Sequence, residues 1–143
     1  MAEYTPAALN VIHQAGRIAR ELGYPFIQRE QLFLGLLQDE SVARILSLLG
    51  LDLQSVRQEV LGRLLPGMGA GDESAAIAML PTAEQVFRQR AQTAAALLGH
   101  TQIGPPELFL GFLVEQSGMV VEVFAALGVT REHVLEAIKR MDK

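Results

Sequence analysis

Few residues in this chain are of the types that catalyse reactions or bind metals. There is no cysteine, which excludes disulfides, thiolate zinc sites and cysteine nucleophiles. The three histidines, His13, His100 and His133, never show the i, i+4 spacing that places two imidazoles on one helix face of a zinc protease. We interpret them as surface or helix-end residues and expect no metal site. One catalytic hypothesis stays open: a small all-α hydrolase that uses His100 with a nearby glutamate.

The sequence motifs also provide little support for phosphate binding or serine catalysis. Gly67, Gly69 and Gly71 resemble a phosphate-binding loop only in being glycines, because no strand precedes them and no Lys-Ser or Lys-Thr follows. The Gly-x-x-x-x-Gly-Lys-Thr or Ser pattern of ATPases is absent, and no serine lies in a Gly-x-Ser-x-Gly context. The sequence therefore predicts a chain that hydrolyses neither ATP nor peptide bonds by itself and needs no cofactor.

The composition predicts one domain that binds neither nucleic acid nor membranes. Half of the 143 residues are hydrophobic, enough for a buried core. The net charge of -4 provides no basic field that would attract phosphates. Apolar runs such as residues 32–37 are far shorter than the ~20 residues of a membrane span. Residues 1–4 lack the pattern of a signal peptide, and we expect a cytoplasmic protein.

The two halves of the chain repeat one another. The same small, glycine and leucine positions recur in the same order, with one short insertion near residues 117–118 in the second half. The aligned pairs include Leu22-Gly23 with Leu98-Gly99, Leu32-Phe33-Leu34-Gly35 with Leu108-Phe109-Leu110-Gly111, and Leu49-Gly50 with Leu127-Gly128. A duplicated order of landmarks over more than half of the chain indicates two copies of one structural unit.

Each copy is predicted to form four helices. Capping residues and glycines give their limits: residues 6–22, 29–38, a third helix ending at Gly50, and a fourth capped by Asp52, then from Thr82 to Gly99, 105–115, a third ending at Gly128, and a fourth capped by Thr130. No segment shows the alternation of a half-buried strand. We therefore predict an all-α domain over residues 1–143, with pseudo-twofold repeats at 4–65 and 80–141 joined by a glycine-rich linker at 66–79.

This duplicated pattern resembles the amino-terminal repeat domain of the Clp ATP-dependent unfoldases. The resemblance covers nearly the whole chain and is carried by Tyr4-Thr5-x-x-Ala8, Ala15, Ala19, Leu22-Gly23, Ile27-x-x-Glu30-x-Leu32-x-Leu34-Gly35-Leu36-Leu37 and Leu49-Gly50, with a second copy from Leu80 to Met141. It implies a domain that docks substrates and adaptor proteins for an ATPase ring and is not itself the motor. The chain would then be either the amino-terminal part of an unfoldase or a free-standing accessory subunit that binds the Clp protease complex.

The resemblance also indicates candidate binding residues. Members of the Clp C type carry Gly-Thr-Glu-His at the start of the second helix of each repeat, where they recognise phosphoarginine. Here the first repeat keeps the acid as Glu30, whereas the second has Pro106 at that position and Glu107 one residue later. Since a helix turns about 100° per residue, this change redirects the carboxylate and leaves at best half a site at Glu30.

A second candidate surface is hydrophobic. Tyr4 and Leu80 occupy the positions where the family has a phenylalanine before the first helix of each repeat, a place that can form part of a groove for a peptide or an adaptor. Each residue alone could equally be a hydrophobic staple that packs on the next helical turn. If the chain binds proteins, an exposed apolar or acidic groove is expected between the repeats.

Overall fold

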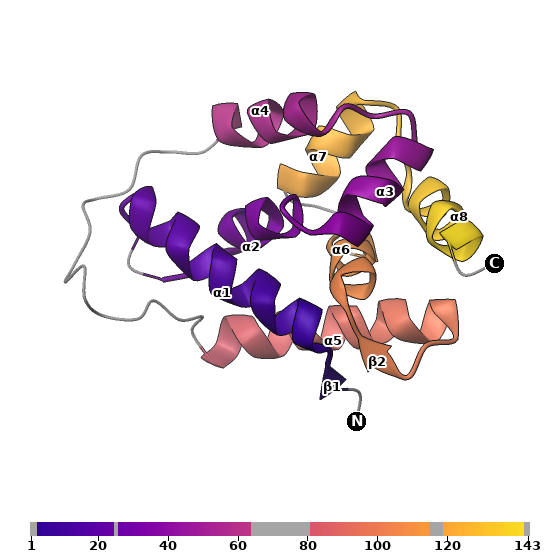
Figure 1. Ribbon diagram of the computed structural model, residues 1–143, viewed down its shortest axis with the longest axis horizontal. Helices are drawn as coiled ribbons and strands as arrows, with labels where there is room; N and C mark the ends of the chain where they lie inside the picture. The colour runs from indigo at the N-terminus through magenta and orange to yellow at the C-terminus, as the bar shows by residue number, and fades with distance from the viewer. Residues whose placement is uncertain (1–2, 25, 64–80, 115–118, 142–143) are drawn as a thin grey trace.

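The computed structural model describes residues 3–24, 26–63, 81–114 and 119–141. Over these residues the regular elements are helices apart from two short strands (Figure 1). Repeat one contains α1 (Pro6–Glu21), α2 (Arg29–Leu36), α3 (Glu40–Leu48) and α4 (Leu53–Arg63), and repeat two contains α5 (Pro81–Leu98), α6 (Pro105–Val114), α7 (Met119–Ala126) and α8 (Arg131–Met141). The predicted all-α class with four helices per repeat is confirmed, whereas the predicted linker at 66–79 lies outside the described residues. The observed α2 is shorter than predicted, and α5 begins one residue earlier.

Side-chain caps explain where several helices begin. The Thr5 hydroxyl oxygen accepts a hydrogen bond from the Ala8 backbone N–H at 3.1 Å, and Pro6 occupies the first turn, where a missing N–H costs nothing. A carboxylate oxygen of Asp52 accepts from the Ser55 backbone N–H at 3.0 Å before α4. These contacts satisfy backbone donors that have no partner within the helix, so the local sequence determines the helix starts.

The short helices α2 and α6 form the centre of the domain. Helices α1 and α5 pack against α2 and α6 from one side, and the remaining helices cover the other side (Figure 1). Gly35 and Gly111 allow these close approaches, since a Cβ atom at Gly35 would lie 2.8 Å from the Val11 carbonyl oxygen, and one at Gly111 would lie 3.2 Å from the Ala91 nitrogen. The repeated glycine in the Leu-Phe-Leu-Gly motif thus lets two helix backbones come together in each repeat.

One aromatic cluster joins the two repeats into a single core. The Phe33 ring of repeat one is fully buried, with ring centroids 5.8 Å from Phe109, 5.6 Å from Phe112 and 5.8 Å from Phe124, all in repeat two. Two of these pairs are edge-to-face, a favourable arrangement for aromatic rings. Within the described residues, the two repeats therefore share one core.

The two strands also join the repeats, and the sequence analysis did not predict them. Strand β1 (Glu3–Tyr4) pairs in parallel with β2 (Gln102–Ile103), and the Thr5 N–H donates to the Ile103 carbonyl at 2.9 Å. Two residues are too few to show an alternating pattern, so the prediction found no strand here. The pairing places Tyr4, from the first repeat, beside the helices of the second.

Candidate functional site

Tyr4 forms a three-residue cluster with α5. The Tyr4 hydroxyl donates a hydrogen bond to Glu84 Oε1 at 3.1 Å, and Arg88 Nε donates to the same oxygen at 3.1 Å. The Arg88 guanidinium carbon lies 4.4 Å from the centroid of the Tyr4 ring, in cation–π geometry. This cluster, which we call the Tyr4 cluster, is half-buried and contains residues from both repeats.

The electrostatics of the Tyr4 cluster keep the phenol protonated at neutral pH. Burial, and then the charge of Glu84 and its hydrogen bond, raise the pKa of Tyr4 to about 12, while Arg88 opposes this shift. The hydrogen bond that Arg88 donates to the Glu84 carboxylate is the main cause that raises the pKa of Arg88, so the guanidinium stays charged. The cluster therefore offers an aromatic ring, a cation and a carboxylate on one surface that includes both repeats, a combination suited to binding a polypeptide.

Glu30 lies in the first turn of α2 and is half-exposed. Its carboxylate has no hydrogen bond or ion pair with the other described residues, and its place near the helix N-terminus stabilises a negative charge. The capping of α2 is done by its neighbour instead: Gln31 Oε1 accepts from the Gln28 backbone N–H at 2.8 Å. Glu30 is therefore available to a partner.

Glu107 occupies the same place in α6 that Gln31 occupies in α2. Its Oε1 accepts a hydrogen bond from the Gly104 backbone N–H at 2.8 Å, and its Oε2 lies 3.2 Å from Nδ1 of His100. Only 6% of the residue is exposed. Unlike Glu30, Glu107 thus directs its carboxylate into the protein, where it caps α6. Leu80, the fourth candidate, lies outside the described residues.

The His100–Glu107 contact brings together the two residue types that the hydrolase hypothesis requires. Both carboxylate oxygens of Glu107 are engaged, and a buried cap residue is poorly placed to reach a substrate. Within the described part of the chain, no group of three or more histidine, aspartate or glutamate side chains could hold a metal ion. In the same residues, no helix is both long and apolar enough to cross a bilayer.

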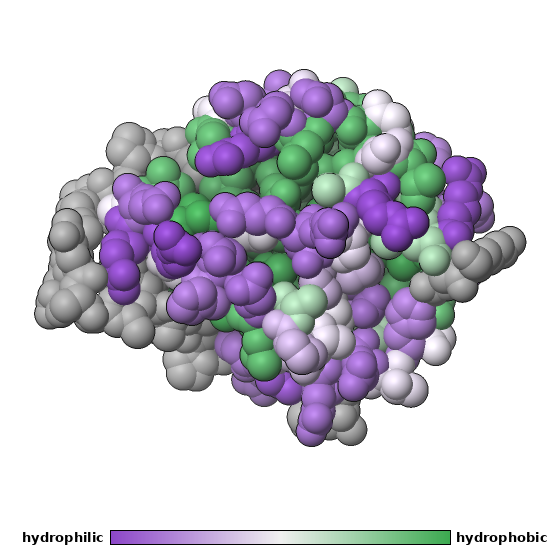
Figure 2. Space-filling model, in the orientation of Figure 1, coloured by the Kyte–Doolittle hydropathy of each residue, from purple (hydrophilic) through white to green (hydrophobic). Residues whose placement is uncertain are grey.

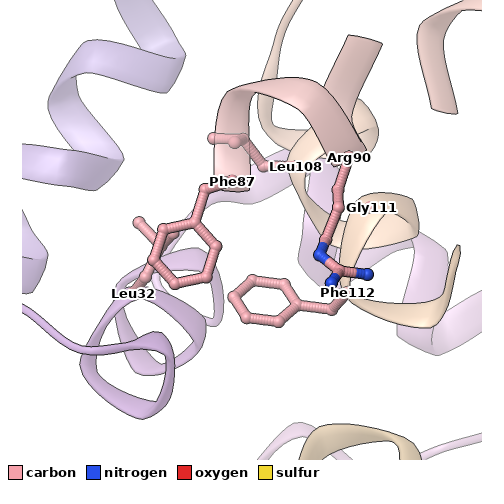
Figure 3. Close-up of a pocket in the computed structure, with 6 residues that line it drawn as sticks. All are labelled: Leu32, Phe87, Arg90, Leu108, Gly111 and Phe112. Carbon is pink, nitrogen blue, oxygen red and sulfur yellow. The ribbon is translucent and has the colours of Figure 1, made fainter. Parts of the chain in front are cut away.

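A small cavity lies where α2 meets α5 and α6. The rings of Phe87 and Phe112, with centroids 5.9 Å apart, face one another beside Leu32 (Figure 3). The volume of the cavity, about 10 Å³, is close to the minimum needed for one water molecule. This cavity is a packing gap of the core and has no room for an organic ligand.

A much larger groove lies between the two repeats, with a volume of about 680 Å³. Its walls are the α3–α4 turn, the corresponding α7–α8 turn, and one face of α8. It is lined by Leu48, Leu49, Gly50, Leu51, Leu127, Gly128, Val129, Glu132, His133, Glu136, Ala137 and Arg140. We call it the turn groove. Elsewhere, on the face seen in Figure 2, apolar surface gathers along the α4 side of the molecule between bands of hydrophilic side chains.

Sequence reasoning did not identify the turn groove, although it identified both turns. Leu-Gly at positions 49–50 and 127–128 was interpreted as the end of a helix, which is correct, since Gly50 has φ 73° and Gly128 has φ 77°. The exposure of Leu48, which is 43%, depends on how α3 is rotated against the rest of the domain. The repeated Leu-Gly pair was the one feature of the sequence that pointed to two equivalent turns at the turn groove.

Two similar four-helix units, with a cluster and a groove that both involve the two repeats, define a class of duplicated helical domains. The chain belongs to the family of the Clp repeat (R) N-terminal domain, which matches residues 3–89 and 81–142. The resemblance in sequence is thereby confirmed.

Relatives that are similar in sequence are Clp proteins. The chaperone protein ClpC of the Pisum sativum chloroplast is 34% identical over 140 residues, which are 96% of this chain and 15% of the relative. A homologue of the ATP-binding subunit ClpA from Guillardia theta is 31% identical, over 96% of this chain and 17% of the relative. The chain thus spans about one sixth of the length of these relatives.

Solved structures show the same fold at low sequence identity. The N-domain of ClpV from Vibrio cholerae has a TM-score of 0.74 and 17% identity, covering 94% of this chain and 82% of that one. The Hsp104 N-terminal domain from Candida albicans has a TM-score of 0.72 and 14% identity, covering 94% and 88%. A ClpV N-domain in complex with a VipB peptide has a TM-score of 0.67 and 17% identity, covering 94% and 88%.

Proposed function

We propose that this chain is a protein-binding domain that docks substrate or adaptor proteins for a Clp-type ATP-dependent unfoldase. The observation that carries the proposal is the Tyr4 cluster, in which a residue of repeat one is held over α5 of repeat two by hydrogen bonds and a cation–π contact. Membership in the Clp repeat family supports this role, and so does the peptide complex of the ClpV N-domain, a protein of the same fold.

The Tyr4 cluster and Glu30 are the residues we propose to contact a partner. The Tyr4 ring provides apolar area with little conformational entropy to lose, and Glu84 and Arg88 provide hydrogen-bonding groups at its edge. The half-exposed Glu30 provides an unpaired carboxylate for a cationic group of the partner. We assign Glu107 a positioning role, because it caps α6 beside the β1–β2 pairing. Leu80 stays a candidate from the sequence.

We further propose that the chain has no catalytic activity of its own. The absence of a phosphate-binding loop motif from the sequence supports the lack of ATPase activity. The burial of Glu107 in a helix cap argues against the hydrolase that would use His100. ATP-driven unfolding would then be the work of a Clp ATPase ring.

The proposal allows two arrangements of the ring. The ring could follow this domain in the same polypeptide, as in the longer relatives, or the chain could act as a free-standing accessory subunit that binds the ring in trans. The expected cytoplasmic location stays a prediction, and one relative named above, ClpC of Pisum sativum, is a chloroplastic protein. The size of the native protein on an immunoblot would separate the two arrangements, because a free-standing chain has a mass of 15.6 kDa.

Binding to an unfolded protein tests the proposal. Fluorescence anisotropy would be measured with labelled, reduced and carboxymethylated α-lactalbumin, a permanently unfolded probe. We expect Tyr4→Ala to weaken binding about fivefold, equal to about 1 kcal/mol, and Glu30→Ala to weaken it less. Glu59→Ala, at an exposed carboxylate on α4, is the matched control and should bind as the unaltered chain does. Undiminished binding by both Tyr4→Ala and Glu30→Ala would remove these residues from the site.

A further inference from the structure

The turn groove has two walls that are built in the same way. In the α3–α4 turn the Leu51 N–H donates to the Leu46 carbonyl at 2.9 Å, and in the α7–α8 turn the Val129 N–H donates to the Phe124 carbonyl at 2.9 Å. These bonds, which join residues five positions apart, close each turn around a glycine in the left-handed conformation. Both walls are therefore fixed by backbone hydrogen bonds before any partner binds, which reduces the entropy lost on binding.

The turns leave the groove open and partly apolar. No described atom lies within 4 Å of the position that a Cβ would take at Gly50 or Gly128, so both glycines border open space. Leu48 is 43% exposed at the rim, while Leu49 and Leu127 are half-buried on the two walls. An exposed leucine beside two more leucines is apolar surface that a partner could bury.

The third wall, α8, presents an ordered series of charges. Glu132, Glu136 and Arg140 are spaced by four residues, so they lie along one face of the helix and all line the groove. Glu132 is in an ion pair with Arg131 at 3.3 Å, and its own backbone N–H, followed by the Arg131 guanidinium, lowers the pKa of its carboxyl. Glu136 and Arg140 form no ion pair with other described residues. The wall is thus acidic at the start of α8 and basic at its end.

The dimensions of this wall match an extended peptide. Eight residues of helix separate Glu132 from Arg140 by about 12 Å, at a rise of 1.5 Å per residue. An extended chain covers about 13 Å in four residues. A peptide with a cation at one position and an anion four residues later would therefore place both charges opposite their complements, with its apolar side chains over Leu48 and Leu127.

We propose that the turn groove binds an extended segment of a partner protein that carries Lys or Arg and, four residues away, Asp or Glu, with apolar residues between them. The proposal rests on the proposed role as a protein-binding domain and adds a second surface, formed by other residues than the Tyr4 cluster. The charge order along α8 and the apolar rim select this occupant over a purely acidic or a purely polar segment.

The test uses three synthetic peptides with blocked ends and the ¹⁵N-labelled chain. The probe has the sequence Gly-Lys-Leu-Val-Leu-Glu-Gly. One control replaces its apolar residues, as Gly-Lys-Ser-Thr-Ser-Glu-Gly, and the other removes its charges, as Gly-Gln-Leu-Val-Leu-Gln-Gly. We expect the probe to shift the amide signals of Gly50 and Gly128 and to bind about tenfold more tightly than either control peptide.

Variants of the chain test which residues of the turn groove contact the probe. Glu132→Gln and Leu48→Ser should each weaken binding of the probe about threefold, because they remove a charge and an apolar contact. Glu21→Gln, an exposed carboxylate on α1, and Leu9→Ser, an exposed leucine of α1, are the matched controls and should leave binding unchanged. Circular dichroism would confirm that each variant keeps its helical content.

Three results would overturn the proposal. These are equal binding of the three peptides, binding that moves only signals around the Tyr4 cluster, and no binding at millimolar concentration. The second result would contradict peptide binding at the turn groove but would not contradict the proposed function. Conversely, the chain could bind the probe at Gly50 and Gly128 but fail to bind unfolded α-lactalbumin. This result would support peptide binding at the turn groove and contradict the proposed role of the Tyr4 cluster.

Discussion

At the scale of single residues, the fold uses glutamates and one tyrosine in different ways according to what surrounds them. Glu30 and Glu107 come from corresponding helix starts, yet one is half-exposed and the other is 6% exposed and hydrogen-bonded on both oxygens. A shift of one position along a helix changes the direction of a side chain by about 100°. Position within the first turn therefore decides whether a carboxylate stays half-exposed or caps its own helix.

The ionisation of Tyr4 is the first prediction. With Tyr24→Phe as the background, the absorbance of the tyrosinate should rise with a midpoint near pH 12, because burial and Glu84 disfavour the phenolate. Since the folded pKa lies above the ordinary value of 10.0, this contribution to stability is full below pH 10 and is lost as the pH rises toward 12. Adding Glu84→Gln should lower the midpoint. A midpoint at 10 in a chain that is still helical would contradict the cluster.

Glu107 provides the second prediction, on stability. Glu107→Ala should lower the free energy of unfolding by about 1–2 kcal/mol, because the buried Gly104 N–H loses its acceptor. Glu107→Gln keeps an oxygen at that place and should cost less. Urea denaturation measures both values. If Glu107→Ala unfolded at the same urea concentration as the unaltered chain, the capping role would be wrong.

At the scale of elements, the close approach of helix pairs depends on the repeated glycine of the Leu-Phe-Leu-Gly motif. The ideal Cβ position at Gly35 is 2.8 Å from the Val11 carbonyl oxygen, a distance that real Cβ atoms do not show. Helix α1 would have to move away from α2 to make room. This contact explains physically why the motif occurs in both repeats.

The third prediction compares two glycine substitutions in helices. Gly35→Ala should destabilise the domain by about 1–3 kcal/mol, since it forces two backbones apart in a packed core. At Gly62 in α4, a Cβ would meet no described atom outside its own stretch of helix within 4 Å, so Gly62→Ala should be neutral or stabilise by about 0.5 kcal/mol through helix propensity. Thermal unfolding of the two variants measures the difference. Equal stabilities would show that the helices tolerate a wider spacing.

The elements were largely predictable because their ends depend on local chemistry. Thr5, Asp52 and the Leu-Gly pairs predict helix limits within a residue or two, and these signals need no tertiary information. The β1–β2 pairing was not predictable, because it joins residues about a hundred positions apart over only two residues each. The burial of Glu107 was not predictable, because the capping-box spacing of Gly104-x-x-Glu107 does not show whether the rest of the chain covers the carboxylate.

At the scale of the whole molecule, two copies of one unit share a core and present two surfaces. Phe33 joins the copies from inside, and the β1–β2 pairing joins them at the surface. The Tyr4 cluster lies at this second junction, and the turn groove lies between equivalent turns of the two repeats. Such surfaces arise only where the repeats meet, so the sequence of a single repeat could not reveal which residues form them.

The junction at the strands leads to the fourth prediction. Thr5→Ala removes the hydroxyl that caps α1 and should cost about 1 kcal/mol of unfolding free energy. Because the backbone N–H at position 5 donates to the Ile103 carbonyl, the variant should also speed hydrogen exchange at that N–H. Exchange measured by NMR would reveal this coupling. If hydrogen exchange at this N–H were unchanged, the Thr5 cap would not contribute to the stability of the β1–β2 pairing.

The measurement that tests the central claim most directly is an NMR map of the contact with an unfolded protein. The ¹⁵N-labelled chain would be titrated with unlabelled, reduced and carboxymethylated α-lactalbumin, and the displaced amide signals would be assigned. Our account predicts displaced signals in β1 and in the first half of α5, around Tyr4, Glu84 and Arg88, and their loss in Tyr4→Ala. An unchanged spectrum, or displaced signals confined to residues far from both surfaces, would contradict a docking domain of this design.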